Sequence, residues 1–369
     1  MKIVYLIRDY INPGGIERVV ANKANYLVNH GYEVYIVSLF DKEDLPFFYF
    51  DPKITFHSLN LIDDKFVNEN FVLKLSSYFN EIKPDIAIST GIGPLNYLYK
   101  VKDSSKKILE LHFAKYKKKY KLARFDSFLL GRLFTSIYSY KRTAIARKYD
   151  AFVVLTDEDR LDWRGLNNIT TIPNPLSFVP NSYSDLKTKR VIAIGRYTTQ
   201  KGFDLLIKAW TMIHQNHKDW YIEIYGEGYL KEFLDNEIIK YNVSNSIFIK
   251  EPTKYIYEEY MNSEFLVLSS RAEGFGLVLA EAMSCGRPCV SFNCPCGPDE
   301  IITDGVNGLL AKNGDVDDLA EKIEWMITHD KERKEMGIRA RESAKRYDKE
   351  KIMTQWINLF NELTNNTNI

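Results

Sequence analysis

Short apolar runs alternate along the chain with longer segments in which apolar residues recur every three or four positions. Runs of this kind, without internal polar alternation, are typical of strands buried on both faces of a parallel sheet. The sequence predicts such strands at residues 2–7, 33–39, 85–90, 107–111 and 151–156, and again at 190–195, 220–226, 246–250, 264–270 and 287–292. A further short strand is expected after the turn in "TDGVNGLL" (303–310).

The intervening segments predict helices, for example from Glu17 to about His30 and over 277–283. Regular alternation of strands and helices indicates parallel sheets. A chain of 369 residues is also too long for one ordinary core. We therefore expect an α/β protein with two doubly wound, Rossmann-like domains that face each other across a cleft. Ligands of such sheets bind beyond the carboxyl ends of the strands.

The segment "IPNPLSF" (172–178) separates the two halves, because its prolines lack N–H donors and stiffen the chain. We expect one domain over 1–173 and a second over 174–345. Residues 346–369 predict an amphipathic helix with no strand after it.

Composition indicates a globular protein that does not bind nucleic acid, with 45% hydrophobic and 27% charged residues and a net charge of +1. The charge is uneven, because residues 1–173 hold 26 Lys and Arg against 20 Asp and Glu, whereas the remainder holds 24 against 29. Segment 111–149 concentrates eleven cations, one acid and nine interleaved aromatics. It predicts either a docking surface for anionic lipid headgroups or a solvated helical face over the core.

Neither a membrane span nor a signal peptide is expected, since no apolar run approaches about 20 residues and the N-terminus "MKIVYLIRDY" is charged by its eighth residue. We expect a cytoplasmic protein, free or peripheral on the inner face of the membrane. Four clustered cysteines, Cys285, Cys289, Cys294 and Cys296, lack paired CxxC spacing and a neighbouring His, so packing is favoured over zinc.

Two carboxylates flank the start of one predicted helix in "RAEGFGLVLAEAMSCG" (271–286). Glu273 precedes the helix and Glu281 lies inside it. Free amides at the helix start favour an anion such as a diphosphate, and Glu281 lies roughly 7 Å further along the axis, where ribose hydroxyls would follow. For an isolated pair of this spacing, the favoured interpretation would be a solvated Glu281 and a loop charge at Glu273.

A second loop after a strand, "GRYTTQKGFD", strengthens the diphosphate interpretation. It places Arg196 and Lys201 at the same edge of the sheet, where two cations each contribute roughly 1.5–3 kcal/mol to binding a diphosphate. A third loop, "YGEG" (225–228), lies at the end of the predicted strand 220–226. In the first domain, "NPGGIER" lacks the dinucleotide fingerprint, but Gly15 precedes a helix, and His112 follows a strand.

In their order along the chain, "GGIER", "ELHFAKY", "GRYTTQKGFD", "YGEG", "EGFGLVLAEAMSCGRPCV" and "EIITDGVNGLL" resemble the retaining glycosyltransferases of family four, which have the GT-B fold. The resemblance covers almost the whole chain and is strongest over 190–345. It implies a nucleotide-sugar donor, with UDP favoured, in the C-terminal domain, an acceptor in the N-terminal domain, and a last helix that returns to the N-terminal domain.

The resemblance also implies roles for single residues. Arg196 and Lys201 would bind the donor diphosphate, Glu281 the ribose, and His112 the sugar near its anomeric centre. Further donor contacts would come from Gly15, Gly226, Glu273, Gly274, Phe275, Gly276 and Leu277, and from the strand end 250–253 with Pro252 against the nucleobase.

Retention by front-face attack needs stabilisation of the departing diphosphate, which the two cations and the helix start would supply without a metal ion. The acidic runs "TDEDR" (156–160) and "DVDD" (315–318) are interpreted as helix starts and not as metal sites. Alternatives are a nucleotide-sugar epimerase or a phosphorylase on the same architecture, and a non-catalytic sugar-nucleotide sensor or surface-binding protein.

Overall fold

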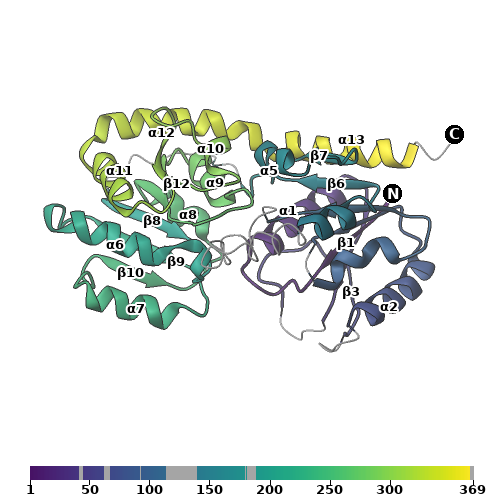
Figure 1. Ribbon diagram of the computed structural model, residues 1–369. Helices are drawn as coiled ribbons and strands as arrows, with labels where there is room; N and C mark the ends of the chain where they lie inside the picture. The colour runs from purple at the N-terminus through teal and green to yellow at the C-terminus, as the bar shows by residue number, and fades with distance from the viewer. Residues whose placement is uncertain are drawn as a thin grey trace. The chain divides into compact units, whose positions relative to one another are not determined.

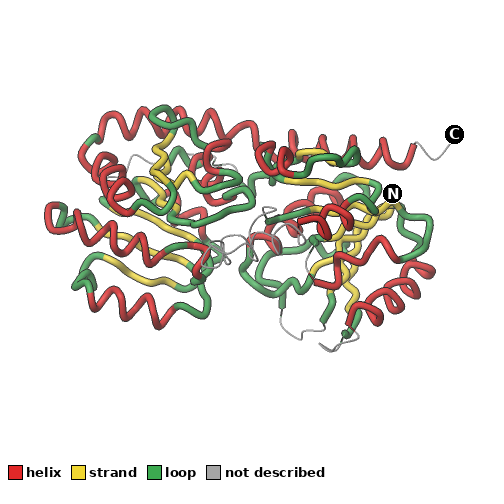
Figure 2. The backbone as a smooth tube through the Cα atoms, in the orientation of Figure 1, coloured by secondary structure: helices red, strands yellow, loops and turns green. Residues whose placement is uncertain are grey.

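A computed structural model describes residues 1–40, 45–61, 67–91, 93–113, 139–178, 180 and 188–365. The chain divides into two compact units, residues 1–177 with 349–369, and residues 178–348 (Figure 1). Each unit contains one parallel sheet, and helices lie on both faces of each sheet (Figure 2). The prediction of two doubly wound α/β domains is confirmed.

The sheet of the first unit has seven parallel strands in the order β3-β2-β1-β4-β5-β6-β7. Strand order reverses between β1 and β4, which is the mark of a doubly wound sheet. The strands are β1 (Lys2–Ile7), β2 (Glu33–Ser38), β3 (Thr55–Ser58), β4 (Ile86–Ser89), β5 (Lys106–Glu110), β6 (Ala151–Val154) and β7 (Ile169–Thr171).

Alternate residues of these strands enter two separate cores, because successive side chains of a strand point to opposite faces. Ile3 and Tyr5 of β1 pack with α1 (Gly15–Asn29) and α13 (Lys349–Asn365). Val4 and Leu6 pack on the other face. There they meet α2 (Val67–Ile82), η1 (Gly93–Lys100) and part of the helical segment 139–146, and α5 (Asp157–Asp162) follows β6. The continuous apolar runs of the sequence thus reflect burial on two faces.

The sheet of the second unit has six parallel strands in the order β10-β9-β8-β11-β12-β13. Its order reverses between β8 and β11. The strands are β8 (Arg190–Ile194), β9 (Tyr221–Tyr225), β10 (Ile247–Lys250), β11 (Phe265–Leu268), β12 (Cys289–Asn293) and β13 (Gly308–Lys312).

One face of this sheet shares a core with α6 (Phe203–Ile213), α7 (Lys231–Lys240) and α11 (Val316–Thr328). On β11 and β12 lies α9 (Leu277–Ser284), which packs in turn against α12 (Asp330–Ala344). The remaining short elements are η2 (Thr199–Lys201), η3 (His214–Asn216), α8 (Ile256–Met261), α10 (Pro298–Ile301) and η4 (Lys345–Tyr347).

Every strand expected from an apolar run is present within about two residues of its predicted bounds. The strands β3 and β7 were not predicted, since they are short, partly exposed and carry no apolar run. Both acidic runs are helix starts as expected: Thr156 accepts a hydrogen bond from the Asp159 amide, and Asp315 accepts one from the Asp318 amide. Of the basic segment 111–149, residues 114–138 lie outside the described residues.

All four cysteines are buried free thiols. In the described ranges, no group of three or more His, Cys, Asp or Glu side chains is arranged to hold a metal ion. None of the helices among those residues is long and apolar enough to cross a bilayer.

A close approach of backbone to backbone brings the loops after β8 and β11 together. Gly202 has φ +65°, and a Cβ atom there would lie 2.0 Å from the carbonyl oxygen of Ser269. Gly314 has a similar φ of +79°, but nothing lies within 4 Å of its Cβ position. These two glycines therefore separate the cost of the left-handed conformation from the cost of the close approach.

We expect Gly314→Ala to lower the free energy of unfolding by about 1–2 kcal/mol, the cost of a left-handed residue with a side chain. Gly202→Ala adds a backbone clash and should cost about 1–3 kcal/mol more. Calorimetric unfolding of both variants measures the difference. Equal losses would show that the two loops do not meet as described.

Candidate functional site

The site of the second unit lies where its strand order reverses. Adjacent strands β8 and β11 are parallel, so the loops that follow them leave the same edge of the sheet. A reversal of strand order is where ligands of open α/β sheets bind. The predicted site residues Arg196, Lys201 and Glu273 all lie in these two loops.

The two loops are joined by hydrogen bonds. Ser269 donates its hydroxyl to the carbonyl of Lys201 at 3.0 Å, and the Arg271 amide donates to the carbonyl of Gln200 at 2.8 Å. The Gln200 side chain donates to the carbonyl of Ala272 at 2.7 Å. Arg271 also forms a two-pronged ion pair with Asp204 at the start of α6, at 2.8 and 2.6 Å. The loops therefore form one rigid edge, which is the preorganisation that a binding site needs.

Lys201 and Glu273 contact one another directly. The lysine Nζ lies 2.7 Å from a carboxylate oxygen of Glu273, and both side chains are largely buried, with exposed fractions of 16% and 8%. Gly195 leaves room for the lysine stem, since a Cβ atom at that position would lie 3.0 Å from it. Arg196 is exposed, and within the described ranges its side chain forms no ion pair or hydrogen bond.

The N-terminus of α9 opens at the same edge. Its N-cap is Gly276, with φ +87° and no side chain to accept from the first amides. In the part of the chain that the structure describes, the amides of Phe275, Gly276 and Leu277 have no hydrogen-bond partner. Unpaired amides at a helix N-terminus carry partial positive charge and attract anions. The structure thus places a lysine, an arginine and three amides at one edge.

Glu281 lies inside α9 and is fully buried. The Tyr260 hydroxyl of α8 donates to its Oε2 at 3.0 Å. The alternative interpretation of the sequence, that Glu281 is a solvated side chain, is wrong, because the side chain is buried. An ionised carboxylate has two oxygens, and each can accept more than one hydrogen bond. Glu281 can therefore accept from Tyr260 and also from a second set of donors, such as vicinal hydroxyls.

The third loop, over Gly226, crosses the loop after β8. A Cβ atom at Gly226 would lie 2.0 Å from the carbonyl oxygen of Gly195. Buried Tyr197 donates its hydroxyl to the carbonyls of Ile224 and Lys250, at 2.9 and 2.5 Å. The Lys250 carbonyl also accepts from the Gly226 amide. The Lys250 carbonyl therefore already accepts two hydrogen bonds. Within the predicted segment 250–253, a ligand would instead meet the backbone of residues 251–253, which include Pro252.

In the first unit, His112 lies two residues beyond β5 and is buried. Its Nε2 lies 3.4 Å from a carboxylate oxygen of Glu110. Glu110 in turn pairs with Lys23 of α1, at 2.7 and 2.6 Å, and both side chains are almost completely excluded from solvent. The aromatic face of Trp356, from α13, covers the lysine at 3.7 Å. Gly15, by contrast, is exposed at the start of α1, with open space around it.

The electrostatics of this group follow from burial and pairing. Burial alone would raise the pKa of Glu110, but Lys23 and His112 lower it to about 2. Burial lowers the pKa of Lys23, and Glu110 opposes that shift. The Lys23 ammonium and the Glu110 carboxylate are therefore charged partners that compensate for each other's burial, and both lie beside His112.

The residues of these networks that were not predicted include Lys23, Glu110, Tyr197 and Tyr260. Two of them carried a signal, because Lys23 interrupts the apolar stripe of its helix and Glu110 ends an otherwise apolar strand. Tyr197 and Tyr260 looked like ordinary aromatic residues, and their hydroxyl contacts depend on the folded chain.

Comparison with known proteins gives consistent matches over the chain. The family descriptions "Glycosyltransferase Family 4" and "Glycosyl transferases group 1" match residues 13–178 and 179–343. An uncharacterized glycosyltransferase of Haemophilus influenzae is 28% identical over 96% of this chain and 98% of its own length. The amylovoran biosynthesis glycosyltransferase AmsD of Erwinia amylovora is 29% identical, over 98% and 99%.

Among solved structures, a mutant of S. aureus TarM, in complex with fondaparinux, α-GlcNAc-glycerol and UDP, superposes with a TM-score of 0.81. It is 20% identical to this chain and covers 98% of it, and the match spans 99% of that protein. At this identity the likeness concerns the fold.

The lowered pKa of Glu110 makes a prediction about acid stability. Because the folded pKa of about 2 lies below the ordinary 4.5, the stabilisation from this carboxylate is present above about pH 4.5 and is lost as the pH falls toward 2. Wild type should therefore exceed Glu110→Gln in unfolding midpoint at pH 6, and the difference should shrink between pH 4.5 and 2.

Urea unfolding of the two proteins across this pH range measures the difference. Other carboxylates titrate equally in both, so they cancel. A difference that stays constant down to pH 2 would contradict an ionised Glu110 in the folded protein.

Proposed function

The chain belongs to the glycosyltransferases of family four, and we propose that it transfers a hexose or N-acetylhexosamine from a UDP-sugar to a bacterial glycan acceptor with retention of anomeric configuration. Its two doubly wound units form the GT-B fold. The observation that carries the proposal is the cluster of Arg196, Lys201 and the free amides of α9 at the reversal of strand order in the second unit.

The diphosphate of the donor binds in this cluster. Its two negative charges meet the Lys201 ammonium, the Arg196 guanidinium and the N-terminus of α9, which are all present before the ligand arrives. Lys201 is held near its position by Glu273, so little side-chain entropy is lost on binding. Glu273 is then beside the diphosphate, on the side where the donor sugar lies.

The nucleoside extends from the diphosphate toward α8 and the end of β10. Glu281 accepts hydrogen bonds from the ribose hydroxyls, and the 251–253 segment contacts the base. Uridine is supported by UDP in the TarM structure, and that structure also holds an α-linked N-acetylglucosaminide. A bacterial glycan acceptor is supported by AmsD, which is named for amylovoran biosynthesis.

The reaction needs no group of the protein to form a covalent bond. The acceptor hydroxyl attacks the anomeric carbon on the face that the diphosphate leaves, the bond from that carbon to the phosphate oxygen breaks, and the hydroxyl proton passes to a departing phosphate oxygen. The charge that develops on UDP is stabilised by Lys201, Arg196 and the α9 amides. In the first unit, His112 is the residue proposed to bind a sugar, and Gly15 is the residue proposed to bind the acceptor.

A nucleotide-sugar epimerase would use the same binding site but leave UDP attached to the sugar. A non-catalytic sugar-nucleotide sensor would release no UDP at all. Slow release of UDP from a UDP-sugar without acceptor therefore distinguishes a transferase from both. The first screen is a panel of UDP-glucose, UDP-galactose and their N-acetylhexosamine counterparts, with UDP release as the measurement.

We expect Lys201→Ala and Arg196→Ala each to weaken UDP binding roughly 10- to 140-fold, from a loss of about 1.5–3 kcal/mol, and to remove most turnover. Glu281→Ala should weaken UDP binding too. Lys218→Ala is the matched control, because this exposed lysine precedes β9 at the opposite edge of the sheet.

Calorimetric titration with UDP and the UDP-release assay, both in EDTA, measure these effects. Wild-type affinity in either cation variant would refute the diphosphate assignment. Complete loss of wild-type turnover in EDTA that Mg²⁺ or Mn²⁺ restores would refute the metal-independent mechanism.

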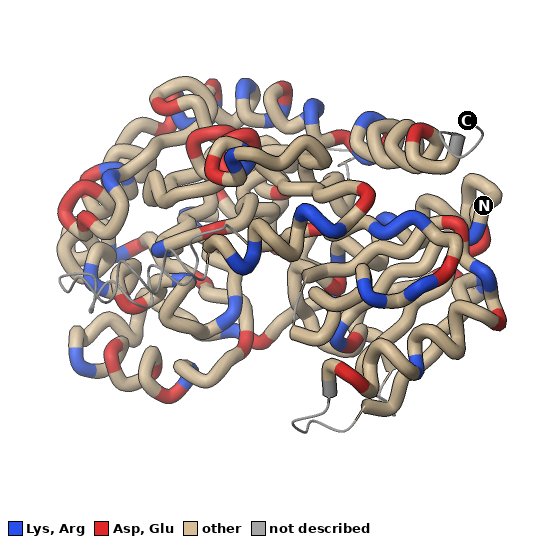
Figure 3. Tube along the Cα trace, turned by 45° about the vertical axis from the view of Figure 1, so that its right-hand side comes forward, with Lys and Arg blue, Asp and Glu red and all other residues tan. Residues whose placement is uncertain are grey.

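We also propose that the basic segment 111–149 docks on anionic lipid headgroups at the inner face of the cytoplasmic membrane. Figure 3 shows Lys and Arg segments on the unit that carries the chain termini, with Asp and Glu segments among them. In the described end of the segment, Lys141, Arg147 and Lys148 are exposed, and so is Tyr140, with an exposed fraction of 73%. Exposed cations together with an exposed aromatic residue suit an anionic interface.

In liposome flotation, we expect recovery with vesicles that contain anionic lipid and little recovery with neutral vesicles. High salt should reduce the recovery, because screening weakens surface electrostatics. Equal recovery with both vesicle types would contradict docking through this segment.

A further inference from the structure

The buried contact between Tyr260 and Glu281 links two different elements of the second unit. The tyrosine hydroxyl lies on α8 and donates to the carboxylate of α9 at 3.0 Å, and neither side chain is exposed to solvent. A glutamate side chain has several rotatable bonds, and fixing it costs up to about 2 kcal/mol of conformational entropy. A donor that already holds one oxygen removes part of this cost before a ligand binds.

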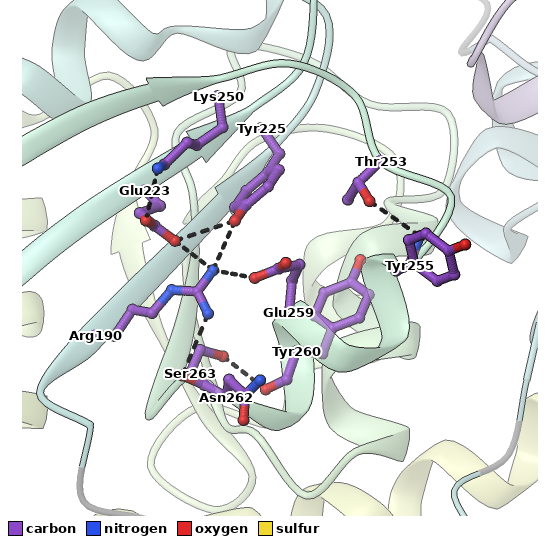
Figure 4. A network of polar contacts seen from close by, with 10 residues as sticks. All are labelled: Arg190, Glu223, Tyr225, Lys250, Thr253, Tyr255, Glu259, Tyr260, Asn262 and Ser263. Carbon is purple, nitrogen blue, oxygen red and sulfur yellow. Dashed lines mark hydrogen bonds and ion pairs between the residues drawn. The ribbon is translucent and has the colours of Figure 1, made fainter.

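Tyr260 itself is held by a network around Arg190 (Figure 4). The guanidinium of Arg190, at the start of β8, contacts Glu259 of α8 and Glu223 of β9, and it donates to the Tyr225 hydroxyl at 2.9 Å. These contacts attach α8 to the sheet one residue before Tyr260.

Aromatic packing holds the same helix on another side. Phe178 packs edge to face against Tyr257, with ring centroids 5.1 Å apart, and lies 6.0 Å from the Tyr260 ring. The start of α8 is fixed as well, since Thr253 accepts the Tyr255 amide at 3.0 Å (Figure 4). The position of the Tyr260 hydroxyl is therefore determined by three sets of contacts.

The helix α8 follows directly on the segment 251–255 beyond β10. One short helix thus connects the segment assigned to the nucleobase with the carboxylate assigned to the ribose. A change in the position of α8 would move both.

We propose that Tyr260 is a positioning residue: its hydroxyl orients the Glu281 carboxylate toward the two ribose hydroxyls. In this way Tyr260 sets the preference of the site for a ribonucleotide. The inference rests on the proposed function, because it takes the ribose as the ligand of Glu281. Tyr260 touches no substrate, and it acts only through the carboxylate. A purely structural tyrosine would instead affect all nucleotides equally.

The test removes the tyrosine hydroxyl from the protein and the 2′-hydroxyl from the ligand, separately and together, and compares the effects on binding. Calorimetric titrations with UDP and with 2′-deoxy-UDP give a ribose discrimination, the ratio of the two dissociation constants, for wild type and for Tyr260→Phe. We expect Tyr260→Phe to weaken UDP binding at least 5-fold, to leave 2′-deoxy-UDP binding within 2-fold, and hence to reduce the discrimination by more than 2-fold.

Tyr257→Phe is the matched control, because it removes a hydroxyl from the preceding turn of the same helix and packs on the same Phe178. Its discrimination should equal that of wild type. Glu259→Gln is the second variant and keeps the test decisive if Tyr260→Phe fails to fold. It leaves the Tyr260 hydroxyl in place but weakens the Arg190 anchor, and it should reduce discrimination in the same direction by a smaller factor.

Three results would overturn the inference, and they are distinguishable. Unchanged discrimination in Tyr260→Phe, or in Glu259→Gln where only that variant folds, would refute the positioning role alone. Equal weakening of both nucleotides would show that Tyr260 only stabilises the fold. Failure of wild type to bind UDP would refute the donor assignment, and the role of Tyr260 with it.

Discussion

The parallel pairing of β8 with β11 is the constraint on which the candidate site depends. These strands are neighbours in the sheet but are separated in the chain by β9, β10 and their helices, because strand order reverses between them. The reversal leaves an opening at the sheet edge that no crossover helix fills. The close approach at Gly202 and the hydrogen bonds between the two loops then turn this opening into a fixed edge where cations and helix amides converge.

Around that edge, polar contacts fix several of the groups that would meet the ligand. Glu273 holds Lys201, Tyr260 holds Glu281, and Tyr197 fixes the ends of β9 and β10. In the first unit the pair of Lys23 with Glu110 lies beside His112, whose Nε2 is 3.4 Å from the Glu110 carboxylate. Groups held in this way lose less entropy on binding than flexible surface side chains, which is the physical advantage of preorganisation.

Much of this could be predicted from the sequence, since burial on both faces of a parallel sheet leaves continuous apolar runs. The loop positions of Arg196, Lys201 and Glu273 followed from those runs and from the rule that ligands bind at the carboxyl ends of strands. The contacts of Tyr260 and Tyr197 could not be predicted, because they join elements that are distant in sequence and depend on side-chain geometry. The edge strands β3 and β7 were also not predicted, since neither contains an apolar run.

A crystal structure of the protein with UDP tests where the diphosphate binds. We expect density for the diphosphate between Lys201, Arg196 and the first amides of α9, with the ribose hydroxyls on Glu281. Density for UDP away from the edge shared by β8 and β11, in crystals where that edge is open to solvent, would contradict this expectation.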